Sequence, residues 1–117
     1  MSVRLEKINK LLKQHLAEII QKDLSLKKGV LVSIIKVDTS PDLRYSKVFI
    51  SILPEKERQY VLATLQKEIY RLQGLLNRRL KTKVFPKIRF IADDFGIKME
   101  KAYQVFRQIE EERRDKN

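Results

Sequence analysis

The stretch Val30–Leu53, VLVSIIKVDTSPDLRYSKVFISIL, decides the fold, because it predicts two strands joined by a tight turn. Residues 30–37 are rich in β-branched side chains and too short a run to favour a helix. Residues 39–42, Thr-Ser-Pro-Asp, predict the turn, since proline presets one backbone dihedral and the Ser and Asp side chains bond the local backbone. In the second strand, residues 45–53, alternation separates two sets of side chains: Val48, Ile50 and Ile52 toward the core, and Lys47, Phe49 and Ser51 on the other face. We expect the two strands to form an antiparallel hairpin.

Amphipathic helices are predicted on both sides of this hairpin. Before it, apolar residues recur at intervals of three and four, which predicts a helix over residues 3–22. After it, Pro54 begins a second helical stretch, whose leucine stripe continues to about residue 81. Gly74 interrupts this long stretch, so we predict a kink or a break into two helices near residues 68–75.

The remainder of the chain completes an α+β fold. Pro86 bars further helix, and residues 88–92 predict a third strand. Asp93-Asp94-Phe95-Gly96 is a predicted turn, and residues 97–113 predict a last helix. The order is therefore α-β-β-α-(kink)-α-β with a C-terminal helix. We expect one domain over residues 1–110 and a charged, frayed tail at 111–117.

The charge balance narrows the possible partners. The 117 residues include 26 Lys and Arg against 15 Asp and Glu, a formal net charge of +11. Such a field attracts polyanions, nucleic acid first and anionic membranes second. No run approaches the roughly 18 apolar residues that a membrane span requires. We expect a cytoplasmic monomer that binds neither a membrane nor a small-molecule substrate.

Residues for catalysis or metal binding are missing from the pattern. The chain has no Cys, which excludes thiolate metal sites, disulfides and a Cys nucleophile. His15 is the only histidine, and we expect it to be partly packed or at the surface. No nucleophile and base stand in a recognisable arrangement, and there is no glycine-rich phosphate loop. We therefore expect no enzymatic activity, no cofactor and no metal.

A basic run without any acidic residue points to nucleic acid instead. It spans the end of the long helical stretch, a loop and the start of the third strand, so we expect a basic surface at one corner of the fold. Cations at a helix C-terminus also interact favourably with the helix dipole, an alternative that accounts for two or three of them but not for Lys83, Lys87 and Arg89. Contacts to phosphates would give affinity with little sequence choice. The run contains Arg71, Arg78, Arg79, Lys81, Lys83, Lys87 and Arg89.

Other residues could extend this surface. Arg4 and Lys7 lie on the first helix, where an ordinary solvated helix face is an equally good interpretation, and Arg44 and Lys47 lie in the hairpin. Tyr45 and Phe49 could stack on bases, although such residues more often belong to a core or cover a sheet.

The order of elements resembles a type II KH module, an RNA-binding fold with a mixed three-stranded sheet packed against helices. The Gly-x-x-Gly loop usual in KH modules is absent from the sequence. The segment Ser40–Ser51 resembles the S-x-D-L-x-x-A-x-V-y-v-s signature of the ribosome-binding factor A family, with Ser46 at the usual Ala. Leu75–Asp93 is similar to the family's L-L … l-R-x-x-P-x-L-x-F-x-x-D, and Arg4–Ile8 to its R-x-x-R-V. The resemblance covers about residues 4–109.

The chain departs from the family pattern in its long helical stretch. The family has an Ala-x-Gly kink where this chain has Glu68-Ile69-Tyr70, and Gln73 stands where an Arg is expected. Either Gly74 supplies the bend or the helix runs through.

The resemblance implies a non-enzymatic ribosome biogenesis factor that binds the maturing 30S subunit and its 16S rRNA during late assembly and rRNA processing. It also implies contact near the decoding region and support of growth in the cold. Two alternatives remain: a KH-like RNA-binding module that acts on other RNA, and a protein adaptor that uses the leucine stripe of residues 62–80 as a helix–helix surface. Intramolecular core is the simpler account of that stripe.

Overall fold

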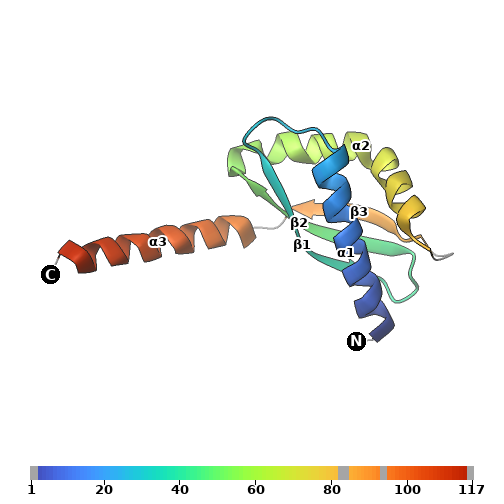
Figure 1. The fold of residues 1–117 in the computed structure, drawn as a ribbon, viewed down its shortest axis with the longest axis horizontal. Helices are drawn as coiled ribbons and strands as arrows, with labels where there is room; N and C mark the ends of the chain where they lie inside the picture. Colours follow the sequence, from blue (N-terminus) through green and yellow to red (C-terminus); the bar gives the residue numbers. More distant parts are fainter. Residues whose placement is uncertain (1–2, 82–84, 93–94, 116–117) are drawn as a thin grey trace.

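The computed structural model describes residues 3–81, 85–92 and 95–115, and it confirms the predicted α+β fold (Figure 1). A short 3-10 turn, η1, precedes the long helix, so Pro54 lies just before η1 and not at the helix start. The elements in chain order are α1 (Val3–Asp23), β1 (Leu31–Thr39), β2 (Tyr45–Leu53), η1 (Glu55–Glu57), α2 (Arg58–Arg79), β3 (Lys87–Ala92) and α3 (Phe95–Asp115).

The sheet is mixed and has the order β1-β2-β3. β1 and β2 form the predicted antiparallel hairpin, while β3 pairs with β2 in parallel. The predicted first strand ended too early, because pairing with β2 continues to Thr39, opposite Ser46. Thr39 therefore belongs to the strand and not to the turn. The register of β1 shifts between Ile34 and Lys36, a bulge that the sequence did not reveal.

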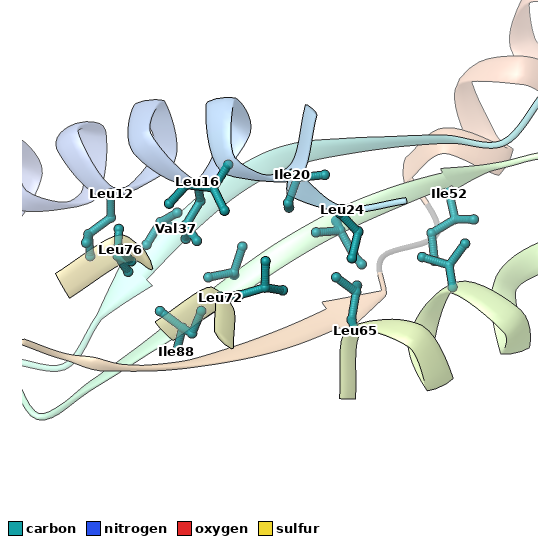
Figure 2. Packing of buried hydrophobic residues seen from close by; sticks show 14 of the residues in the cluster. Leu12, Leu16, Ile20, Leu24, Val37, Ile52, Leu65, Leu72, Leu76 and Ile88 are labelled. Carbon is teal, nitrogen blue, oxygen red and sulfur yellow. The ribbon is translucent and has the colours of Figure 1, made fainter. Parts of the chain in front are cut away.

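The core fills the space between one face of the sheet and the two helices α1 and α2. Leu12 and Leu16 of α1 meet Leu72 and Leu76 of α2 over Val37 of β1 (Figure 2). The core set predicted for β2 is confirmed, since Val48, Ile50 and Ile52 are all buried. The leucine stripe of α2 is used inside the fold, so it offers no free surface to the adaptor alternative: Leu65, Leu72, Leu76 and Leu80 are buried, and Leu62, Ile69 and Leu75 pack partly buried against them.

The long helix is continuous, so the break that was one of the two predictions for residues 68–75 is wrong. Figure 1 shows that α2 nevertheless changes direction between its green and yellow halves. A Cβ atom at Gly74 would meet no neighbouring heavy atom within 4 Å, so packing does not require a glycine there.

The C-terminal helix begins earlier than predicted. Phe95 and Gly96, assigned to a turn, are the first two residues of α3, while Asp93 and Asp94 lie outside the described residues. The helix continues to Asp115, so residues 111–115 of the predicted frayed tail are helical. It extends away from the sheet (Figure 1), and the domain end near residue 110 stays a prediction. Tyr103, Phe106 and Ile109, predicted on one side of this helix, are exposed.

Candidate nucleic-acid interface

The hairpin turn is held by side chains of its own residues. Ser40 Oγ donates to Asp42 Oδ1 at 2.6 Å, and the Arg44 N–H donates to the same oxygen at 3.1 Å. These two bonds, the Ser40 bond first, hold the pKa of Asp42 below its usual value. They support Leu43, which has a positive φ of 63° that is costly for a residue with a branched side chain. The Ser-x-Asp-Leu part of the signature therefore builds the turn that carries Arg44.

The start of β3 is fixed from two sides. Its Lys87 N–H donates to the Arg44 carbonyl at 2.8 Å, which ties β3 to the hairpin turn. From α2, the Gln73 Oε1 accepts the Ile88 N–H at 2.9 Å, and Gln73 Nε2 donates to the Pro86 carbonyl at 3.1 Å and to Asn77 Oδ1 at 2.9 Å. Gln73 thus has a structural role at the position where the family pattern has Arg.

The free edge of β1 has a similar clamp from α1. Asn9 Oδ1 accepts the Thr39 N–H at 3.0 Å. The buried Thr39 hydroxyl is 2.8 Å from that of Ser46, which stands where the family signature has Ala. The two hydroxyl groups satisfy one another in the interior, so the exchange of Ala for Ser leaves no polar atom unpaired there.

The predicted basic run divides between two faces of the molecule. Arg71 donates through Nε to Glu68 at 2.7 Å and through its guanidinium to the Asp23 carbonyl at the end of α1. Arg79 forms an ion pair with Glu18 of α1. Both arginines therefore join α2 to α1, and each forms an ion pair with a carboxylate of the protein itself.

Five other predicted cations are exposed and form no ion pair with the described residues: Arg78, Lys81, Lys87, Arg89 and Lys47. Arg44 has only a long contact of 3.9 Å to Asp42. Lys83 lies outside the described residues. The structure thus brings Lys87 and Arg89 together with Lys47, because β3 runs beside β2.

Arg4 and Lys7 line a depression of about 410 Å³ whose floor is apolar. Leu11 and Leu12 of α1, Leu43 of the hairpin turn and Leu80 form that floor. These two basic residues therefore lie beside the turn that carries Arg44, at one end of the sheet.

One basic residue was missed by the sequence analysis. Lys36 of β1 lies with its Nζ 4.8 Å from the centre of the Phe49 ring, directly across the strand pair. Only the register would have found it, because the bulge before Lys36 changes which face it occupies.

The described residues give little support for other chemistry. Half-buried His15 fits its prediction, and its Nδ1 is buried without a hydrogen-bond partner in the part of the chain that is described. Within the same residues, no group of three or more His, Cys, Asp or Glu could hold a metal ion. Helices long and apolar enough to span a membrane are also not found in the described ranges.

Comparisons with known proteins identify the family. The family model described as ribosome-binding factor A matches residues 4–106. Ribosome-binding factor A of Thermomicrobium roseum is 33% identical over 113 residues, which cover 96% of this chain and 88% of the relative. That of Nitrosococcus oceani is 35% identical over 92 residues, 78% of this chain and 72% of the relative.

Solved structures show the same fold. The crystal structure of ribosome-binding factor A from Thermus thermophilus superposes with a TM-score of 0.65 at 26% identity, covering 75% of this chain and 94% of that one. Coordinates of the Thermus thermophilus factor fitted into a cryo-EM map of its 30S complex give a TM-score of 0.64 at 26% identity, covering 80% and 96%. With the family model matched over most of its length, this chain belongs to the ribosome-binding factor A family, which is a family of ribosome-binding factors and not of enzymes.

Proposed function

We propose that this protein binds the small ribosomal subunit and its 16S rRNA in the cytoplasm, and assists late subunit assembly. The observation that carries the proposal is the set of exposed cations that the described residues leave unpaired around the hairpin and β3. A relative's fit into a map of its 30S complex supports the same partner. Exposed cations with free ammonium and guanidinium groups suit the phosphates of folded RNA.

The eleven residues predicted from the sequence remain the proposed interface. Their expected contributions to binding differ, because some of them already form ion pairs within the protein. Arg71 and Arg79 would have to leave carboxylates before they could meet a phosphate, so their net contribution should be small. Lys81, Lys87 and Arg78 need no such exchange. Arg4, Lys7 and Arg44 would extend the contact along the end of the sheet, beside the apolar depression.

Co-sedimentation with small subunits tests this function. The protein should migrate with 30S particles at low salt, and protein that stays at the top of the gradient would contradict the proposal. If short free RNA is bound as tightly as subunits, a general RNA-binding module becomes the better description.

Charge removal then tests the interface. Affinity for RNA falls as salt rises, and each phosphate contact adds roughly 0.7 to 0.9 to the steepness of log affinity against log salt concentration. The variant Arg78→Gln/Lys81→Gln/Lys87→Gln should therefore make this dependence shallower by about 2 to 3. The matched control, Lys22→Gln/Lys28→Gln/Lys56→Gln, removes the same charge from exposed positions elsewhere. Equal slopes for both variants would remove these three residues from the interface.

A further inference from the structure

The face of the sheet opposite the helices carries basic and aromatic side chains in register. Lys47 lies opposite Arg89, and Tyr45 lies opposite Lys87, on the neighbouring parallel strands β2 and β3. Phe49 of β2 lies opposite Lys36 of β1 on the other side. Because side chains alternate along a strand, all of them point to the same face. We call this set the open-face cluster: Lys36, Tyr45, Lys47, Phe49, Lys87 and Arg89.

The positive charge of the open-face cluster is not balanced within the described residues. Lys47 and Arg89 are lateral neighbours on strands about 4.8 Å apart, and like charges directly opposite one another destabilise a sheet. Asp38 lies opposite Lys47 on β1, yet no ion pair joins the two in the described structure. Phosphate groups of a bound polyanion would offset this repulsion, because each cation would then lie beside a negative charge.

The two aromatic members of the open-face cluster differ in exposure. Tyr45 is 59% exposed, although it lies in the middle strand of the sheet. The half-buried Phe49 ring is covered at one side by the Lys36 ammonium group, in cation–π geometry. Lys47 lies between the two rings along β2, so ring, cation and ring follow one another on a single strand.

We propose that the open-face cluster binds a single-stranded segment of RNA, with a base stacked on Tyr45 and phosphates held by Lys36, Lys47, Lys87 and Arg89. The proposal rests on the proposed function only in taking RNA as the polyanion. A duplex keeps its bases within its own stack, so exposed rings are of use to unpaired bases alone. The exposed Tyr45 ring therefore favours a single strand over a duplex, which would use only the cations.

Fluorescence anisotropy with a labelled short oligouridine tests the stacking. Tyr45→Ala should weaken binding roughly five- to a hundredfold, the range for loss of one base–aromatic stack. Tyr45→Phe should bind as the wild type does, because the ring and not the hydroxyl group carries the contact. Tyr103→Ala is the control, since Tyr103 of α3 is 63% exposed but far along a different element.

The same assay at several salt concentrations tests the cations. Lys47→Gln/Arg89→Gln should reduce the salt slope by about 1.4, or roughly 0.7 for each phosphate contact of a single strand. Lys22→Gln/Lys28→Gln, with the same loss of charge, should change it less. Circular dichroism spectra of all variants should match the wild type, since every substituted side chain is exposed.

The outcomes separate this proposal from the proposed function. If Tyr45→Ala and Lys47→Gln/Arg89→Gln bind oligouridine like the wild type, the open-face cluster is not an RNA site, whether or not the protein co-sediments with small subunits. If duplex RNA or anionic vesicles bind as tightly as the single strand, and Tyr45→Ala changes nothing, the face is only an electrostatic surface and the proposal is overturned. Loss of oligouridine binding confined to the open-face variants supports it, even for a protein that fails to bind subunits.

Discussion

Replacing Gln73 by Ala should loosen β3, because one carboxamide holds the start of this strand to α2. The side chain makes three hydrogen bonds, to the Ile88 N–H, the Pro86 carbonyl and Asn77. A typical bond contributes about 0.5 to 1.5 kcal/mol net, and the Ile88 amide would lose its partner beside a buried side chain. We expect the free energy of unfolding to fall by about 2 to 3 kcal/mol, or roughly 10 °C in Tm.

Urea unfolding followed by circular dichroism measures this loss. Gln66→Ala is the matched control, since Gln66 is exposed on the same helix and should change stability by less than about 0.5 kcal/mol. Hydrogen exchange offers a local test, because the Ile88 amide should exchange faster in Gln73→Ala than in the control. If both variants unfold at the same urea concentration and Ile88 stays protected, the clamp does not hold the strand.

Four further predictions concern stability and binding. Leu16→Ala should lower the free energy of unfolding by about 2 to 5 kcal/mol in a urea titration, since Leu16 is fully buried, and a loss below about 1 kcal/mol would contradict its place in the core. Gly74→Ala should raise stability by about 0.5 to 1 kcal/mol, because the added methyl group has open space and Ala favours a helix; a lower midpoint would show that the bend of α2 needs glycine. Hydrogen bonds lower the pKa of Asp42 from its usual 3.8, so the ionised carboxylate favours folding above that value and this contribution is lost as the pH falls through the lowered pKa; Asp42→Asn should therefore lose less stability on acidification. Arg79→Gln should change the salt slope of RNA binding less than Arg78→Gln, since Glu18 already pairs with Arg79, and the reverse order would refute that ranking.

Most of the fold could be predicted because apolar spacing determines it. The alternation at Val48, Ile50 and Ile52 gave the bounds of β2 and its buried face, and the leucine spacing gave the length of α1 and the existence of α2. Two element boundaries could not be predicted from the local residue types. Thr39 belongs to β1 because Ser46 lies opposite it, and Phe95 begins a helix although a glycine follows it.

For the candidate interface, the sequence indicated which basic residues to consider, but not how they are arranged in space or with which residues they pair. Charge spacing along the chain identified Arg79 but not its partner Glu18, which precedes it by 61 residues. The lateral placement of Lys47 beside Arg89 requires the parallel pairing of β2 and β3 and its register, neither of which a single sequence encodes locally. Lys36 lies on the open face of the sheet because of the bulge before it, and no residue type in β1 indicates that bulge.

The two carboxamide clamps have a consequence for association between molecules. Thr39, Ser46 and Ile88 form one row across all three strands, and Asn9 and Gln73 occupy the outward amides at its two ends. An exposed edge strand is a template on which another chain can add a strand and begin to aggregate. To pair at this row, an incoming strand would first have to displace Asn9 from the Thr39 N–H or Gln73 from the Ile88 N–H. Side chains of α1 and α2 therefore block strand addition at both edges of the sheet in this row. The open face can stay exposed to solvent without the edges at this row pairing with another chain.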